Sequence, residues 1–422
     1  MERTSKSRVQ PSGSRARPAD LTYLDALFSI EIGWSLASVL AWVIGESRHI
    51  QRPAEFIETL CDRLLEAGAP VWRVGLDVRT IHPRFAAWHL TWDRDTRQVG
   101  EKMMGHSFRD TVTYGGSPTQ RVHQEGEMVR CRLDRLDTKV DHPSLQFLAA
   151  RGGTDYVAFP LEFSTGQLNA LCIATDRAGG FAELDIAKFR VLTELLALPI
   201  EIFVEHRAAL ALLDTYVGAR AGRRVLQGLI RRGAGDVIDA AIWFSDLRDF
   251  TALTETLPWA QLLATLNDYF EFVGAAVTPQ GGEILHFIGD AILVVFPIST
   301  EGDRRPACRA ALEAAHDALN GIATVNKRRT RTGLPEIRFG VGLHVGEVVY
   351  GNIGTLDRLT FTVMGSAVNR SARLQNMTKA LARPVLLSTD FAACVDEPVE
   401  SLGRHLLKGI EQPQEIFAPL GI

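Results

Sequence analysis

Two aspartates, Asp246 and Asp290, stand where predicted strands end. Residues 240–255 (AAIWFSDLRDFTALTE) predict a buried strand that runs into a helix, with Asp246 at the junction. Residues 281–297 (GGEILHFIGDAILVVFP) predict a hairpin, because two apolar runs flank the turn dipeptide Gly289-Asp290. If the two segments lie side by side, their carboxylates can share two Mg²⁺ ions about 3.5–4 Å apart, a geometry suited to in-line displacement at phosphorus.

The residues that follow Asp246 are suited to binding an anion. Thr251 and the backbone N–H groups before it open the predicted helix. Helix N-termini favour anions, because their unpaired N–H groups and the helix dipole point at the ligand. A phosphate-binding loop is therefore predicted beside a metal-binding carboxylate.

A third segment, residues 360–375 (TFTVMGSAVNRSARLQ), predicts a strand that passes through Gly365 into a helix. Asn369 and Arg373 are four residues apart and therefore share one face of that helix. An arginine there can stabilise charge on a phosphorane, and an amide can hold a ribose oxygen. Taken alone, each of the three signals is ordinary, since strand-end aspartates often belong to turns and polar helix faces usually meet solvent.

Together and in this order, four motifs resemble those of the class III nucleotidyl cyclases. They are FSDLRDFT (244–251), FIGDAILVVF (287–296), GLHVGEVVYGNIG (342–354) and VMGSAVNRSARL (363–374). The resemblance covers residues 236–420 and implies that this part has an α+β fold, built on a ferredoxin-like βαββαβ unit. It also implies a homodimer whose two equivalent sites lie at a head-to-tail interface.

The resemblance also implies roles for particular residues. Asp246, Asp290 and the carbonyl of Leu247 match the ligands of two Mg²⁺ or Mn²⁺ ions per site. Asn369 and Arg373 match the ribose-orienting and transition-state residues, which the partner chain supplies.

Other positions match residues that hold the base and the phosphates. His286 and Thr362 match the pair that reads the purine. The predicted phosphate contacts are Arg248, Phe250, Thr251 and Lys408. The register around Lys408 also leaves a surface role open for this lysine.

The implied reaction converts ATP into 3′,5′-cyclic AMP and pyrophosphate by attack of the 3′-hydroxyl on the α-phosphorus. One metal ion lowers the pKa of this hydroxyl, and the other holds the β- and γ-phosphates. A guanylate cyclase and a non-catalytic nucleotide-binding regulator of the same fold are the alternatives. The intact metal aspartates and the pair Asn369 and Arg373 argue against the regulator.

Two positions depart from the family's pattern. Members that make cyclic AMP commonly have Lys at the position of His286, paired with Asp, Thr or Ser at the position of Thr362. Guanine readers usually have Glu and Cys at these positions, so adenine is favoured here. Asp249 stands where the motif usually has Gly, and its charge either weakens triphosphate binding or points to solvent.

Composition and charge narrow the class of protein further. A chain of 422 residues predicts two domains with linkers, and a net charge of −4 gives no reason to expect a nucleic-acid partner. The five cysteines are scattered without a CxxC pair. This pattern argues against a disulfide framework or a zinc site and favours the cytoplasm.

Three further segments are predicted before the cyclase-like part. Residues 1–20 form a basic tail rich in Ser and Pro, which we expect to be disordered. Residues 21–200 mix helical and strand-like patterns and resemble a GAF-type sensory domain, with a purely structural or dimerising domain as the alternative. Residues 201–235 predict a helical linker.

Within the N-terminal domain, residues 27–45 are mostly apolar but contain Glu31, and their uncharged run is shorter than the roughly 20 residues that a membrane-spanning helix needs. We expect a buried or partner-covered helix here, with a membrane anchor as the alternative. Trp72, Trp88 and Trp92 lie in strand-like runs and are expected in the core.

A long helical pattern covers residues 188–230. Pro199 is expected to break or kink it, because proline removes a helix hydrogen bond. Five apolar residues partly repeat at helical spacing beyond this point: Leu210, Leu213, Val217, Leu226 and Ile230. They predict pairing with the same helix of a second chain, with packing on its own domain as the alternative.

Overall fold

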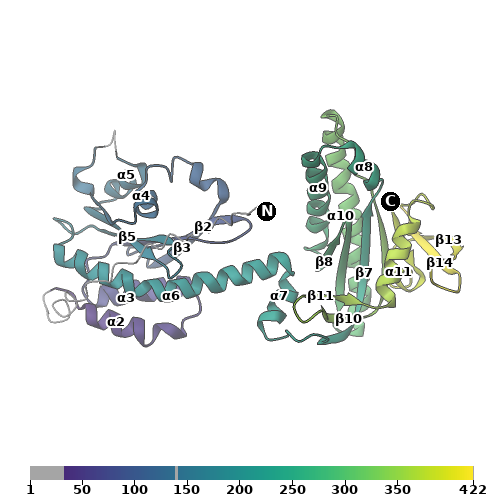
Figure 1. The fold of residues 1–422 in the computed structure, drawn as a ribbon, viewed down its shortest axis with the longest axis horizontal. Coiled ribbons are helices and arrows are strands. Elements are labelled where there is room, and N and C mark those ends of the chain that lie inside the picture. The colour runs from purple at the N-terminus through teal and green to yellow at the C-terminus, as the bar shows by residue number, and fades with distance from the viewer. Residues whose placement is uncertain (1–32, 138–140, 422) are drawn as a thin grey trace, which may run out of the picture. The chain divides into compact units, whose positions relative to one another are not determined.

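The structure, a computed structural model, describes residues 33–137 and 141–421. Contacts divide the chain into two compact units, Met1–Ala209 and Leu210–Ile422, and each combines helices with a sheet (Figure 1). The predicted tail over residues 1–20 and the first part of the segment 27–45 lie outside the described residues.

The N-terminal unit is built on a six-stranded antiparallel sheet with the order β3-β2-β1-β6-β5-β4. Its strands are β1 (Arg73–Arg79), β2 (Phe85–Asp93), β3 (Gln98–Gly105), β4 (Val129–Arg132), β5 (Asp155–Glu162) and β6 (Leu168–Thr175). Its helices are α2 (Leu36–Ile44), α3 (Pro53–Glu66), α4 (Pro118–Glu125), α5 (Pro143–Ala150) and most of α6 (Glu183–Tyr216).

Helices pack on both faces of this sheet. On one face, α2, α3 and α6 share a core with the sheet that includes Phe56, Trp88 and Phe189. On the other face, α4 and α5 contribute Val122 and Leu145 to a smaller core. The helical and strand-like patterns expected within residues 21–200 correspond here to α3 and to the strands β1, β2, β4, β5 and β6. Strand β3 was not predicted, because its residues are largely exposed and lack an apolar alternation.

The apolar segment before α3 is partly described. Helix α2 buries one of its faces and exposes the other. The buried residues are Leu36, Val39, Leu40, Trp42 and Val43. Within residues 33–137 and 141–421, no helix has both the length and the apolar character needed to cross a bilayer. Trp72, Trp88 and Trp92 are buried, as predicted.

Helix α6 differs from its prediction. It continues from Glu183 to Tyr216 with Pro199 inside it, so Pro199 does not break the helix, which was one of the two outcomes expected for this proline. Buried packing of Leu196 and Ile200 holds the helix on either side of the missing hydrogen bond. The helix ends instead just before Gly218, whose φ of 97° lies outside the helical region.

The predicted pairing stripe is also corrected. A separate helix, α7 (Ala219–Leu226), follows the end of α6, and Ile230 lies beyond it. Val217, between the two helices, packs against a core cluster of the C-terminal unit. The five apolar residues from Leu210 to Ile230 therefore do not share one continuous helix face.

The C-terminal unit contains an eight-stranded sheet with the order β13-β14-β12-β10-β7-β9-β8, and β11 pairs with β10. Its strands are β7 (Gly235–Leu247), β8 (Glu283–Ile288), β9 (Ala291–Ile298), β10 (Phe339–Gly354), β11 (Leu359–Met364), β12 (Val385–Ser388), β13 (Val399–His405) and β14 (Gln414–Pro419). Its helices after α7 are α8 (Phe250–Thr256), α9 (Trp259–Val277), α10 (Arg304–Arg331), α11 (Ser366–Met377) and α12 (Thr389–Ala392).

The centre of this sheet follows the chain order β7, α9, β8, β9, α10, β10, with neighbouring strands antiparallel. One face of the sheet is covered by α9 and α10, around Trp243 and Tyr269. The other face carries α11, whose Ala367 packs with Ile242 and Val348 (Figure 1). The strand-to-helix junctions expected at β7–α8 and β11–α11 are both present.

Candidate active site

Strand register brings the two predicted metal aspartates together. Asp246, near the end of β7, lies opposite Ala291, the first residue of β9. Ile288 of β8 also pairs with Ala291, so Gly289 and Asp290 form the tight turn that the sequence predicted. Gly289 has a φ of 66°, which glycine adopts without strain. The turn therefore presents Asp290 beside the end of β7.

The Asp246 and Asp290 carboxyl groups lie within hydrogen-bonding reach of each other. Burial, followed by this neighbouring carboxyl, raises the pKa of Asp246 to about 7. The Asp246 Oδ1 atom is buried and has no hydrogen-bond partner among the described residues. Two adjacent carboxylates with an unsatisfied oxygen fit a divalent cation, which prefers oxygen ligands and relieves their repulsion.

A buried hydrogen bond supports the end of β7. The hydroxyl groups of Ser245 and Tyr269 lie 2.7 Å apart, and both side chains are fully buried. Because Ser245 precedes Asp246, this bond ties the strand end to helix α9. The backbone that carries the predicted metal ligand Asp246 is thus held by packing on its opposite face.

A surface cavity of about 590 Å³ opens at the two aspartates. Its walls come from the end of β7, from α8, from the β8–β9 turn and from the chain after α11. The lining residues are Asp246, Leu247, Asp249, Phe250, Thr251, Ala252, Glu255, Asp290 and Lys379. The structure therefore brings five predicted site residues, Asp246, Leu247, Phe250, Thr251 and Asp290, to one cavity, which we call the carboxylate pocket.

Asp249 lies at the mouth of the carboxylate pocket. It has left-handed backbone angles (φ 61°, ψ 26°), a conformation that favours Gly and is tolerated by Asp, which accounts for the motif's usual Gly. Its carboxylate accepts a hydrogen bond from Lys379 Nζ at 2.7 Å and lies 3.5 Å from Arg338. Lys379 holds the pKa of Asp249 below its usual value.

Lys379 was missed by sequence reasoning. It follows α11 and contacts a loop that lies far away in the sequence, and no motif spacing links the two. Only the folded path of β10 and α11 across β7 brings this lysine to the pocket.

Two of the predicted phosphate contacts lie outside the carboxylate pocket. The Arg248 guanidinium donates to the carbonyls of Thr378 and Arg383 at 3.3 and 3.1 Å, and its backbone N–H donates to Arg338. Arg248 is thus engaged with the chain after α11. Lys408 is exposed in the connection between β13 and β14 and does not line the pocket.

Asn369 and Arg373 lie on α11, where Asn369 is exposed and Arg373 is partly exposed. Neither residue lines the carboxylate pocket of its own chain. Two close approaches seat the helix on the sheet: the Ser371 hydroxyl donates to the Gly342 carbonyl at 2.8 Å, and Gly340 lies against Thr378.

The predicted base-reading residues lie on two strands that approach each other without pairing. His286 is on β8 and Thr362 is on β11, and Leu285 and Val363 beside them pack in one core cluster. Burial lowers the pKa of His286, so its imidazole is neutral at physiological pH. Both side chains are half-buried, and neither lines the carboxylate pocket.

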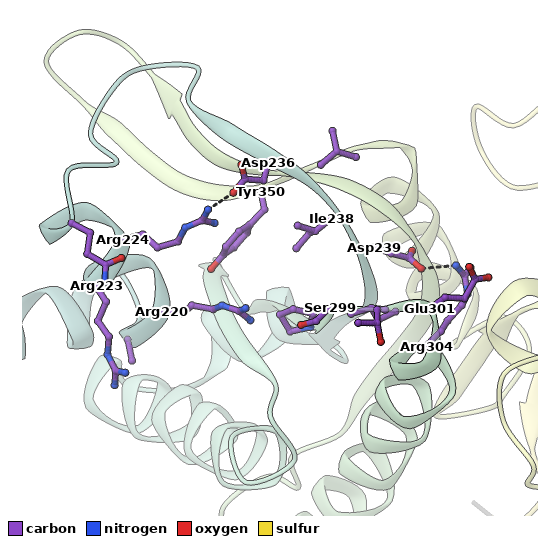
Figure 2. A pocket seen from close by; sticks show the side chains of 16 residues that line it. Arg220, Arg223, Arg224, Asp236, Ile238, Asp239, Ser299, Glu301, Arg304 and Tyr350 are labelled. Carbon is purple, nitrogen blue, oxygen red and sulfur yellow. Dashed lines mark hydrogen bonds and ion pairs between the residues drawn. The ribbon is translucent and has the colours of Figure 1, made fainter.

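A larger cavity, of about 950 Å³, lies elsewhere in this unit, at the start of β7 (Figure 2). It is lined by arginines from α7 and α10, and its ion pairs join Arg224 to Asp236 and Arg304 to Asp239. Asp246 lies ten residues further along β7 than Asp236, roughly 33 Å along an extended strand. The larger of the two cavities therefore lies at the end of β7 that is far from Asp246.

The metal ligands available from one chain are few. Among the described residues, no group of three or more His, Cys, Asp or Glu side chains is arranged to hold a metal ion. Any cation in the carboxylate pocket would thus rely on Asp246, Asp290, backbone oxygen and the oxygens of a ligand. This donor set suits a hard cation such as Mg²⁺ that is bound together with phosphate.

These features belong to a known class of domain. Residues 235–417 match the model of the adenylate and guanylate cyclase catalytic domain. The C-terminal part of the chain is therefore a class III nucleotidyl cyclase catalytic domain. The match does not extend to the antiparallel sheet of the N-terminal unit.

Relatives support this assignment at moderate identity. Adenylate cyclase 1 of Rhizobium meliloti (strain 1021) is 29% identical over 319 residues, which cover 70% of this chain and 45% of the relative. The adenylate cyclase of Anabaena cylindrica is 34% identical over 180 residues, which cover 42% of this chain and 35% of the relative. The chain thus spans less than half the length of these two relatives.

Solved structures give weaker matches. The guanylyl cyclase Cya2 is 31% identical with a TM-score of 0.39, and the match covers 44% of this chain and 94% of that one. A bacterial light-regulated adenylyl cyclase is 21% identical with a TM-score of 0.45, and the match covers 60% of this chain and 83% of that one.

Proposed function

We propose that the C-terminal unit converts ATP into 3′,5′-cyclic AMP and pyrophosphate, using two divalent cations at a homodimer interface. The observation that carries the proposal is the pair of adjacent carboxylates, Asp246 and Asp290, on the wall of a pocket that opens at the start of α8. The relatives named adenylate cyclase support ATP as the substrate.

Asp246, Asp290 and the carbonyl of Leu247 would hold the two Mg²⁺ or Mn²⁺ ions. When bound, these ions lower the pKa of the ribose 3′-hydroxyl and neutralise charge on the phosphates. The buried, unpaired Oδ1 of Asp246 supports this role, because a cation would give that oxygen the partner it lacks.

The remaining residues position the nucleotide. The Thr251 hydroxyl and the backbone N–H groups of Phe250 and Thr251 donate to phosphate oxygens. Asn369 holds a ribose oxygen, and Arg373 stabilises negative charge on the α-phosphate as the 3′-oxygen attacks and pyrophosphate leaves. No side chain is needed as a strong base.

The site is shared between two chains. Asn369 and Arg373 lie outside the carboxylate pocket of their own chain, so a second chain supplies them. Helix α6 supports pairing, because exposed apolar residues recur along it at heptad spacing: Leu195, Leu198, Ile202 and Tyr216. This stripe replaces the one that the sequence predicted.

His286 and Thr362 are proposed to read adenine. A neutral imidazole offers one hydrogen-bond donor and one acceptor, which matches the amino group and ring nitrogen on the edge of adenine. A guanylate cyclase remains the second candidate, since His286 departs from the family's usual lysine.

The N-terminal unit, residues 21–200, is proposed to be a sensory domain that regulates the catalytic residues 236–420 through residues 201–235. A cavity of about 260 Å³ in this unit supports a small-molecule signal. Phe108, Phe147 and Tyr156 give it apolar walls, and the Asp77–His89 pair, with nitrogen and oxygen 3.1 Å apart, gives it a polar end.

The test uses the purified full chain with ATP or GTP and either Mg²⁺ or Mn²⁺. We expect cyclic AMP and pyrophosphate in equal amounts, with faster turnover of ATP than of GTP. Asp246→Ala and Asp290→Ala should each remove most of the turnover while circular dichroism remains unchanged. Faster formation of cyclic GMP would identify a guanylate cyclase, and nucleotide binding without either product would identify a regulator.

A further inference from the structure

The carboxylate pocket is short of positive charge. Its described lining includes four carboxylates, Asp246, Asp249, Glu255 and Asp290, and one cationic side chain, Lys379. A triphosphate carries several negative charges, and its non-bridging oxygens are commonly held by Lys or Arg in addition to metal ions. Within one chain, the described lining of the pocket therefore offers a single cation for the phosphates, Lys379.

Three other cations, Arg248, Lys408 and Arg338, do not line this pocket within the same chain. The Arg248 side chain already donates to two carbonyls after α11 and lies outside the pocket lining. Lys408 is exposed on the connection between β13 and β14 and, like Arg373, lies outside the pocket of its own chain, so it would reach a pocket only in a partner chain. Arg338 approaches Asp249 at 3.5 Å but is also absent from the lining.

The backbone before Lys379 is well fixed. Thr378 closes α11 and packs directly against Gly340 of β10, where no side chain intervenes. The Thr378 carbonyl accepts hydrogen bonds from the Arg383 backbone and from the Arg248 guanidinium. Lys379 thus extends from an anchored point toward the pocket.

The Lys379 ammonium group is already paired with the carboxylate of Asp249. The two side chains form a 2.7 Å ion pair but remain 43% and 75% exposed, respectively. An exposed ion pair of this kind contributes little stability and is readily exchanged for another anion. A phosphate entering the pocket would compete with the Asp249 carboxylate for the same ammonium group.

We propose that Lys379 is the cation that binds the phosphates of the nucleotide, and that Asp249 is a built-in competitor that must release it. This inference rests on the proposed function, because it concerns the same pocket. It adds Lys379 to the phosphate contacts predicted from the sequence, and it gives the unusual Asp249 a role in setting nucleotide affinity.

The test is a double-mutant cycle in the full chain. Lys379→Ala should raise the KM for ATP by roughly tenfold or more, the effect expected from losing a charge-assisted hydrogen bond, with a smaller change in kcat. Asp249→Asn keeps the side-chain size and the tolerance of left-handed angles, and it should lower KM several-fold. In the double variant, the gain from Asp249→Asn should be clearly smaller, because only the direct repulsion of the phosphates is removed and Lys379 is no longer there to be released.

Two further lysines provide controls. Lys327→Ala removes an exposed lysine on α10 that lies outside the pocket lining, so its KM should equal that of the unmodified chain. Lys408→Ala tests the rival assignment. A rise in KM for Lys408→Ala with no rise for Lys379→Ala would overturn the proposal, as would an equal gain from Asp249→Asn with and without Lys379.

A binding arm separates this inference from the proposed function. 3′-Deoxy-ATP lacks the attacking hydroxyl, so calorimetry with it and Mg²⁺ measures affinity without turnover. Lys379→Ala should weaken its binding, and Asp249→Asn should strengthen it. If the chain makes no cyclic nucleotide but shows these shifts, the proposed function fails and the Lys379 assignment stands. If the chain is an active cyclase with unchanged affinity in both variants, the Lys379 assignment fails alone.

Discussion

At the scale of single residues, the closeness of Asp246 and Asp290 that suits a cation also opposes folding. The pKa of Asp246 is raised from 3.8 to about 7, so the folded protein binds a proton more tightly than the unfolded chain does. Stability should therefore fall as the pH rises from about 4 to about 7, where the folded pair loses this proton. A bound divalent cation would cancel this cost.

This reasoning predicts the effect of Asp290→Asn on stability. With EDTA at pH 8, the variant should melt roughly 2–4 °C higher, because about 1 kcal/mol of repulsion is removed after allowance for solvent screening of a half-exposed group. At pH 4 the difference should shrink, since a protonated Asp246 does not repel Asp290 in the unmodified chain. Differential scanning calorimetry measures both, and an equal gain at the two pH values would contradict the argument.

At this scale, the sequence predicted that Asp246 and Asp290 meet, but it did not predict every residue around them. Their meeting followed from local signals, a strand end and a tight turn, and the hairpin formed as expected. Lys379 could not be predicted, because its contact with Asp249 joins distant segments and depends on an unusual backbone conformation at Asp249. The predictions for Arg248 and Lys408 relied on motif position alone, and neither side chain lines the pocket of its own chain.

At the scale of elements, glycines of β10 determine where α11 lies. A Cβ atom added at Gly342 would lie 2.2 Å from the Ser371 carbonyl oxygen and 2.5 Å from the Gln375 nitrogen. Both atoms belong to the helix backbone and cannot turn aside as a side chain would. Close backbone approach at this glycine thus fixes the helix that presents Asn369 and Arg373.

We expect Gly342→Ala to push α11 away from the sheet. The variant should lose about 1–3 kcal/mol of stability from overpacking and most of its cyclase activity. Gly274→Ala is the matched control, because its Cβ would make only an ordinary 3.6 Å contact inside helix α9, where Ala is favoured. Urea unfolding compares the two, and equal stabilities would show that α11 adapts.

From the sequence, it was easier to predict whether a segment forms a helix or a strand than to predict where that helix or strand ends. Strand alternation and turn residues predicted β7, β8, β9 and the start of α11 because these signals are local. The helix does not break at Pro199, because buried packing on both sides of the proline outweighs one lost hydrogen bond. Strand β3 was not predicted from the sequence, because a mostly exposed strand needs no alternation of apolar and polar residues.

At the scale of the whole molecule, the proposed site needs two chains, which a complementation experiment tests. Asp290→Ala and Arg373→Ala should each be nearly inactive alone. Mixing them should rebuild one intact site per heterodimer, with the aspartates from one chain and Asn369 and Arg373 from the other. Activity per heterodimer should return to about half, because the second site carries both lesions.

Differently tagged chains and a pull-down show whether heterodimers form. Mixing two preparations of the same variant provides the control and should give no recovery. Heterodimers without regained cyclic AMP synthesis would mean that catalysis does not use residues from two chains.

If a second chain supplies Asn369 and Arg373, as proposed, the output of the enzyme also depends on its concentration. When paired chains are scarce, the number of complete sites grows with the square of the chain concentration, by mass action. Doubling the protein would then raise synthesis about fourfold, and dilution would silence it faster than it removes protein. A cell could set a threshold for the signal through expression level alone, before any ligand reaches the N-terminal unit.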